Sequence, residues 1–229
     1  MRVIAGTSGY SYKEWKGTFY PDDLPASKML SFYARHFGAV EINNTFYRMP
    51  NETLIGKWES EVPEGFTFIL KAPNWIEYRP GPEPVGKFFD IAALLGSKLG
   101  PALFRRHSVN GLRDLLSFVP EEQRVCIEFR GDVAIDDDTL AALREHNAAL
   151  CIADTDEVAD PDSLLVSTAS WGYLRLRRSE YSDKELKAWV RRVKAQPWSE
   201  AYVFFKHEDE GKGPRFAKRF LELLGKNPD

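Results

Sequence analysis

Short apolar runs rich in β-branched and aromatic residues recur along the chain and alternate with longer segments of helical periodicity. This rhythm is typical of strand and helix units built around a parallel sheet. Eight such runs occur, at residues 2–6, 39–42, 67–71, 101–105, 124–130, 149–154, 171–175 and 201–206. Helices are expected between them, at residues 28–37, 54–60, 84–99, 111–119, 138–147, 183–195 and 214–224. The pattern predicts an α/β fold, a (β/α)8 TIM barrel formed as a single domain over residues 1–229.

Several of these helices carry end signals. Ser27 is expected to cap the helix at 28–37, Ser182 with Glu185 resembles a capping box, and Pro214 suits a first helical turn. After the sixth strand only residues 161–165 could form a short helical turn. No linker divides the chain, because the proline-rich residues 80–84 indicate a rigid turn before a helix.

The composition indicates a folded protein with a large core, since 43% of the 229 residues are hydrophobic and 28% are charged. The net charge of −3 gives no overall attraction to nucleic acid or to an anionic membrane. Residues 3–6 are too short for a signal segment, and no run approaches the roughly 18 apolar residues of a membrane span. We expect a soluble, cytoplasmic protein with no membrane partner.

The cysteines and histidines do not indicate a metal centre. Cys126 and Cys151 lie inside apolar runs and are expected to be buried hydrophobes in a reducing compartment. The four histidines are scattered: His36 and His146 are expected on helices, His107 follows the fourth strand, and only His207 lies near a predicted strand C-terminus. Glu41, Glu128 and Asp154 could hold Mg²⁺ or Mn²⁺ through oxygen ligands, but nearby basic residues compete for them. We therefore expect neither a metal nor a cofactor.

Polar residues gather where the predicted strands end, which is where parallel barrels place functional side chains. Period-2 alternation directs Val40 and Ile42 toward the helices and Glu41 and Asn43 toward the interior. Alternation or position at a strand end gives further candidates: Lys71, Glu128, Arg130, Asp154, Tyr173, Arg175 and Arg177. A buried charge costs several kcal/mol unless it is paired, so these groups should pair with one another or with a ligand.

Two interpretations of these charges remain. A structural ion-pair network would also occupy an inert barrel. The charged residues come from five separate strand units and all lie at predicted strand C-termini, and this convergence favours a ligand site. Glycines in residues 6–12 could admit an anion to backbone N–H groups or simply form a tight turn, and they match no nucleotide-binding motif. Aromatic residues crowd the first three loops, where they could stack on a ligand or pack as a lid.

Four motifs, GTSGYSYKEWKGTFYP, VEINNTFYRMP, FILKAP and IEFR, occur in this order. Through them the chain resembles the YecE-like family, domain of unknown function seventy-two, over essentially its whole length. The resemblance implies a TIM-barrel fold and no established activity. By position it implies these strand-end residues: Ser8, Tyr10, Glu41, Asn43, Thr45, Tyr47, Lys71, Glu128, Arg130, Asp154 and Arg175.

Three strand-end loops depart from the family pattern. They carry Glu77-Tyr78, Arg177-Arg178 and Lys206-His207, where the family usually has Thr-His, His-Gly and Asn-Asn, and the segment at 208–214 also differs. Either the substrate differs from that of typical members, or part of the site has lost its original role.

The first functional hypothesis is a metal-independent enzyme, a hydrolase, lyase or isomerase, acting on a small anionic molecule. Lys71, Arg130 and Arg175 would clamp a phosphate or carboxylate, with Glu41 or Glu128 as general acid or base. Lys71 completes the catalytic set, and Arg177 and His207 join the substrate-binding set. The alternatives are nucleic-acid binding or phosphodiester processing, and a non-catalytic ligand-binding barrel. The sequence does not indicate the oligomeric state.

Overall fold

Parallel strands alternate with helices along the chain. The structure, a computed structural model, describes residues 1–207 and 210–225. Residues 208 and 209 of the divergent last loop therefore lie outside the described residues. The strands are β1 (Arg2–Ser8), β2 (Ala39–Ile42), β3 (Thr67–Leu70), β4 (Ala102–Arg106), β5 (Val125–Phe129), β6 (Ala149–Leu150), β7 (Ile152–Asp154), β8 (Trp171–Leu176) and β9 (Glu200–Phe205).

Helices follow most of the strands. They are α1 (Met29–Tyr33), α2 (Glu52–Ser60), α3 (Asn74–Tyr78), α4 (Pro82–Ala92), α5 (Leu112–Ser117), α6 (Asp137–Glu145), α7 (Asp183–Lys194) and α8 (Lys212–Leu223). The capping box between Ser182 and Glu185 is confirmed. The Ser27 cap is wrong, because Ser27 lies within a 3-10 turn and Lys28 occupies the cap position of α1. The helix expected to reach residue 99 ends at Ala92 and continues only as a 3-10 turn.

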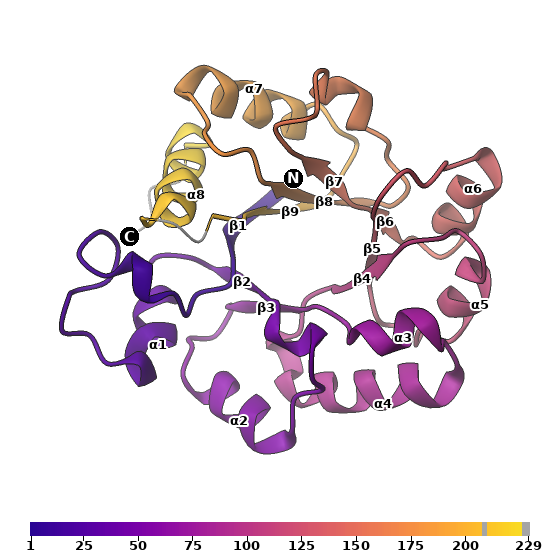
Figure 1. Cartoon of the computed structure of the whole chain (residues 1–229), viewed down its shortest axis with the longest axis horizontal. Coiled ribbons are helices and arrows are strands. Elements are labelled where there is room, and N and C mark those ends of the chain that lie inside the picture. Colours follow the sequence, from indigo (N-terminus) through magenta and orange to yellow (C-terminus); the bar gives the residue numbers. More distant parts are fainter. Residues whose placement is uncertain (208–209, 226–229) are drawn as a thin grey trace.

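The strands form two parallel sheets. One has the order β3-β2-β1-β9-β8-β7, and the other has the order β4-β5-β6. Figure 1 shows the strands around the centre of the molecule with the helices at its periphery. The fold is therefore α/β with parallel sheets, as the alternation of strand and helix patterns predicts.

The two faces of the strands bury different residues. One face packs against the helices through residues such as Val40 and Leu174. The opposite face forms a separate apolar cluster of Ile4, Ala39, Ile69, Leu103, Cys126, Ala149, Trp171, Tyr173, Tyr202 and Phe204. Every second residue of a strand shares a face, so the next residue on this inner face lies two positions further along each strand, closer to its C-terminus. There the chain has Glu41, Lys71, Arg105, Glu128 and Arg175.

The helices are short. The longest, α7 and α8, have 12 residues each. Within the described residues, no helix has both the length and the apolar character that crossing a bilayer requires. The cytoplasmic location expected from the sequence stays a prediction.

Candidate functional site

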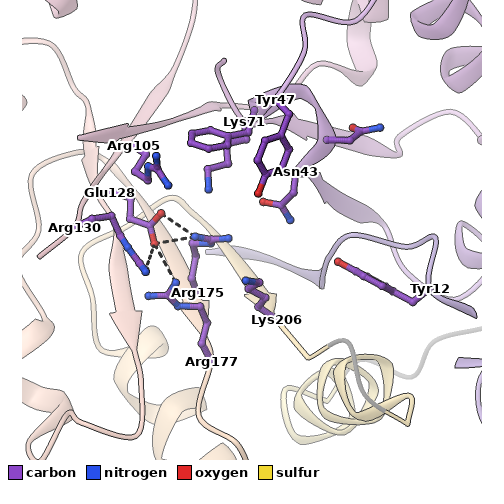
Figure 2. Close-up of a pocket in the computed structure, with 12 residues that line it drawn as sticks. Tyr12, Asn43, Tyr47, Lys71, Arg105, Glu128, Arg130, Arg175, Arg177 and Lys206 are labelled. Atoms are coloured by element: carbon purple, nitrogen blue, oxygen red, sulfur yellow. Dashed lines mark hydrogen bonds and ion pairs between the residues drawn. The ribbon is translucent and has the colours of Figure 1, made fainter. Parts of the chain in front are cut away.

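Arg175 lies at the centre of a buried ion-pair cluster (Figure 2). Its side chain is 2% exposed, and its Nη1 donates to both carboxylate oxygens of Glu128 at 2.8 Å. Its Nη2 donates to Oε1 of Glu41 at 2.8 Å. Burial alone would raise the pKa of Glu128, but Arg175, aided by Arg177 and Lys71, outweighs burial and lowers it to about 2. Glu128 is therefore an ionised anchor and a poor proton donor.

Glu41 is held by neutral donors as well as by Arg175. The Tyr173 hydroxyl donates to Oε2 at 2.6 Å, and the Ser8 hydroxyl donates to Oε1. The Asn43 amide in turn donates to Ser8 Oγ at 2.8 Å. Burial, followed by the neighbouring Glu41, raises the pKa of Tyr173, which keeps the phenol protonated as a donor. Glu41 is thus a fully buried acceptor that fixes Arg175, and it is absent from the lining of the cavity above.

A cavity of about 380 Å³ opens above this cluster, within the usual size range of small-molecule sites. Figure 2 shows the side chains of Lys71, Arg105, Arg130, Arg175 and Arg177 gathered near Glu128. Six of the lining residues are basic: Lys71, Arg105, Arg130, Arg175, Arg177 and Lys206. Among the described residues, Glu128 is the one carboxylate of the lining. The remaining lining residues are Tyr12, Asn43, Asn44, Phe46 and Tyr47.

Lys71 is 8% exposed and follows directly after β3. Its Nζ lies 4.5 Å from the centroid of the Phe46 ring. Across residues 1–207 and 210–225, no hydrogen-bond acceptor or ion-pair partner of this ammonium is found. Burial, together with the charge of Arg175, lowers the pKa of Lys71 to about 8 against the opposing effect of Glu128. The backbone is fixed, since Lys71 N donates to Ile42 O at 3.1 Å.

The arginines around Lys71 keep unused donors. Arg130 and Arg177 each place Nη1 3.5 Å from Glu128 Oε1, beyond ordinary hydrogen-bond length. Arg105 stacks over Phe46 at 4.1 Å. In the described part of the chain, the buried Nε atoms of Arg105 and Arg177 have no hydrogen-bond partner. These groups can therefore receive an anion without first breaking a strong protein ion pair.

Asp154 does not belong to this site, contrary to the sequence expectation. Its Cα pairs with Leu176 of β8, which packs on the helix side of the strands. The carboxylate accepts from Arg178 Nε at 2.8 Å, Tyr181 Oη at 2.9 Å and Trp189 Nε1 at 3.0 Å. Asp154 therefore ties β7 to the region of α7. The three carboxylates of the magnesium alternative are not brought together, and no group of three or more potential ligands is found in the described residues.

The other four expected binding residues each lie in a different place. Tyr47 is 78% exposed and lines the cavity mouth. Thr45 is buried below it, where its hydroxyl donates to the Lys71 carbonyl at 2.7 Å. Tyr10 instead packs against Tyr33, 6.3 Å between ring centroids, and burial raises its pKa. His207 lines an adjoining depression of about 540 Å³, which shares Arg130, Arg177 and Lys206 with the cavity.

Sequence reasoning missed two basic residues of the lining. Arg105 lies two positions after inward-facing Leu103, and Lys206 lies two positions after inward-facing Phe204. The same alternation that selected Glu128 would have selected both.

The geometry defines a parallel α/β protein whose strand C-termini surround a cation-lined cavity. The chain belongs to the family described as "Protein of unknown function DUF72", whose model matches residues 4–229. The resemblance expected from the motifs is therefore confirmed.

Two curated relatives match shorter segments. The UPF0759 protein YecE of Escherichia coli K12 is 28% identical over 111 residues, covering 44% of this chain and 41% of that protein. The UPF0759 protein YunF of Bacillus subtilis is 38% identical over 70 residues, covering 31% of this chain and 24% of that protein. The matches thus span less than half the length of these relatives.

Solved structures of the family share the fold. A DUF72 family protein of Thermotoga maritima has a TM-score of 0.85 and 24% identity, covering 99% of this chain and all of that one, 100%. A DUF72 family protein of Enterococcus faecalis has a TM-score of 0.82 and 19% identity, covering 99% and 97%. At this identity the likeness shows the fold alone.

Proposed function

We propose that the cavity binds a small anionic molecule, bearing a phosphate or a carboxylate, and that the protein is an enzyme acting on it. The observation that carries this proposal is the convergence of six basic side chains on one cavity with a single lining carboxylate among the described residues. Arginine presents a planar fork of donors that matches phosphate and carboxylate oxygens. Net positive charge in a partly dry cavity is stabilised when an anion enters.

The residues take distinct roles in this proposal. Arg130 and Arg177 bind the anion at the rim, because their contacts to Glu128 are long. Glu41 and Glu128 hold Arg175 in place; Glu41 does not line the cavity, and Glu128, with a pKa of about 2, is a poor proton donor. Lys71, with a pKa of about 8, is the group best matched to proton transfer near neutral pH. The geometry thus favours Lys71 over the two glutamates as the acid or base.

The arrangement supports a small ligand over a nucleic acid. The basic groups are gathered in one cavity of about 380 Å³, whereas a nucleic acid needs phosphate contacts spread along its backbone. It also supports a chemical role over an inert ion-pair network, because the described chain gives the Lys71 ammonium the Phe46 ring in place of a carboxylate and leaves the buried Nε of Arg177 without a hydrogen-bond partner.

Calorimetric titration at low ionic strength tests the proposal. Inorganic phosphate should bind wild type, and Arg177→Gln should weaken binding by about tenfold, the size expected for loss of one charge-assisted hydrogen bond. The matched control is Arg113→Gln, since Arg113 pairs with Asp138 and Glu145 on the surface. No binding of phosphate, sulfate or citrate would refute the proposal. Tight binding of an oligonucleotide would favour the nucleic-acid alternative.

We also propose that the two sheets close into one barrel. Between β3 and β4, Ala72 N donates to Leu103 O at 2.9 Å and Gly100 N donates to Phe68 O at 2.8 Å. Between β6 and β7 only Cys151 intervenes, and its N donates to Ile127 O at 2.9 Å. In a closed barrel these three amides should exchange hydrogen as slowly as those in β1 and β9. Fast exchange at Ala72 and Gly100 would indicate an open edge.

A further inference from the structure

We propose that Lys71 is a nucleophile that forms a Schiff base with the carbonyl carbon of an anionic aldehyde or ketone, such as a 2-oxo acid. This inference rests on the proposed function, because the arginines must first hold the anionic group. It narrows the substrate from any small anion to one that carries a carbonyl group next to, or near, its charge.

The position of Lys71 meets the geometric needs of such a nucleophile. The side chain lines the cavity, so a bound molecule can reach its Nζ. Its backbone is held on both sides, by Ile42 O at 3.1 Å and by the Thr45 hydroxyl at 2.7 Å. The ammonium rests on the Phe46 ring and has no carboxylate within ion-pair distance among the described residues. A structural lysine at this depth would be expected to have such a partner.

The charges around Lys71 favour its neutral form. Burial and Arg175 of β8 oppose its protonation, as does Arg105 of β4, while Glu128 of β5 and Glu41 of β2 support it. Both glutamates are engaged by Arg175, which weakens their support. With a pKa of about 8, the neutral amine at pH 7 is about 200- to 300-fold more abundant than in an ordinary lysine. Lysines activated by desolvation and neighbouring cations are the type that attacks carbonyl groups.

The covalent step balances without a further reactant. The neutral Nζ adds to the carbonyl carbon, a C–N bond forms, and the carbonyl oxygen takes the proton that the nitrogen loses. The resulting carbinolamine then expels its oxygen as water, which requires one proton from solvent and leaves a protonated imine. The net change is one ammonium and one carbonyl giving one iminium and one water. The iminium keeps the positive charge of Lys71 in the cavity.

Reductive trapping tests the inference. Wild type is incubated with pyruvate and sodium borohydride, which adds hydride to the iminium carbon and fixes the adduct as a secondary amine. Lactate, which has the same carboxylate and no carbonyl, is the matched probe. Peptide mass spectrometry should find the pyruvate adduct on Lys71 at least about tenfold above any exposed lysine, given its larger neutral fraction. Labelling of Lys71 should rise through pH 8.

Two variants control the assignment. Lys71→Arg keeps the charge and should bind inorganic phosphate while losing the adduct. Lys184→Arg, on the exposed side of α7, should leave both unchanged. If Lys71→Arg does not fold, peptide mass spectrometry of the wild-type adduct still shows whether Lys71 forms the Schiff base.

The outcomes separate the two proposals. Phosphate binding in the cavity without an adduct on Lys71 overturns the Schiff base and leaves the anion site standing. Absence of anion binding overturns both. Equal labelling of Lys71 and the exposed lysines also contradicts the inference, because it would mean that the cavity does not activate the amine.

Discussion

Lys71 and Lys98 are both buried lysines, and they lie at opposite ends of the strands. Lys98 closes the 3-10 turn that precedes β4, and its Nζ lies 2.7 Å from Glu59 Oε1 and 3.5 Å from Glu64 Oε1. It also donates to the carbonyls of Glu59 at 2.8 Å and Val62 at 3.3 Å. The hydrogen bond to Glu59 raises the pKa of Lys98, whereas burial lowers that of Lys71. Lys98 thus has carboxylate and carbonyl partners within the protein, whereas the Lys71 ammonium faces the cavity, where a ligand can bind it.

The arginines at the two ends repeat this contrast. Before β5, Arg124 donates to Glu200 Oε2 at 2.8 Å and to the Tyr202 hydroxyl at 2.9 Å. At the C-terminal ends, the buried Nε atoms of Arg105 and Arg177 form no hydrogen bond within the described residues, and Arg105 Nε makes only a long contact of 3.6 Å with Glu77 Oε2. Charges at the strand N-termini thus satisfy one another, which serves stability, while those at the C-termini leave capacity for a ligand.

The largest loss of stability is expected at Arg175, the one arginine at the strand C-termini of the described chain that forms short ion pairs with two buried glutamates. Arg175→Met should lower the free energy of unfolding by about 3–5 kcal/mol, because Glu41 and Glu128 would remain buried without their counter-ion. Urea-induced unfolding followed by tryptophan fluorescence measures this loss. Adding Glu41→Gln and Glu128→Gln to the variant should recover part of it. A single variant as stable as wild type would show that the glutamates are not held by Arg175.

Asp154 tests whether the face of a strand matters more than its end. Asp154→Ala should lower the free energy of unfolding by about 2–3 kcal/mol, because Arg178, Tyr181 and Trp189 lose their shared hydrogen-bond acceptor. The affinity for inorganic phosphate should not change, since the carboxylate points toward α7. Denaturation and calorimetric titration on the same sample separate the two effects. Weakened phosphate binding at unchanged stability would return Asp154 to the site.

The pH dependence of stability distinguishes the two lysines. The pKa of Lys71 is lowered on folding, so between pH 8 and 10.5 the unfolded chain binds more protons and stability rises with pH. Wild type should gain about 2 kcal/mol over this range, after allowance for partial solvation, and Lys71→Met should not. The variant should also be the more stable protein at pH 7. Lys98→Met should instead lower the stability of the protein, because Glu59 loses its ion-pair partner. If both methionine variants were more stable than wild type, Lys71 and Lys98 would not differ in the way proposed.

The smallest effect is expected at the N-terminal end. Arg124→Ala should lower stability by only about 0.5–1 kcal/mol, because the pair with Glu200 is partly exposed. Its affinity for phosphate should equal that of wild type.

Arg177→Ala should show the opposite result, with weaker phosphate binding and little change in stability. If both variants bind phosphate equally well, the difference between the two ends has no functional meaning.

Alternation in the sequence predicts much of the site. Once Val40 and Ile42 are assigned to the helix side, Glu41 and Asn43 must face inward, and the structure places them there. The prediction for Asp154 is wrong, because Asp154 shares the helix-side face of its strand with Leu150 and Ile152. Position at a strand end does not determine the face of a side chain, since neighbouring residues of a strand point to opposite faces.

Other features depend on three-dimensional contacts that no local pattern contains. The sequence places Arg175 inward but cannot show that one guanidinium engages glutamates from two strands. Nor does it show that Lys71 is left unpaired, since this follows from where Glu41 and Glu128 are already committed. Tyr10 could not be separated from Tyr47, because both lie in loops, and only packing against Tyr33 turns Tyr10 away.

Arg175 also links the two sheets. Glu41 belongs to β2 of the six-stranded sheet, and Glu128 belongs to β5 of the three-stranded sheet. Neither sheet can separate from the other without exposing a charge that the guanidinium now neutralises, so the two should unfold in a single cooperative transition. Arg175, beneath the cavity, thus makes the folding of the two sheets cooperative. A ligand that displaced the Arg175 guanidinium would change the ion pairs of both sheets at the same time.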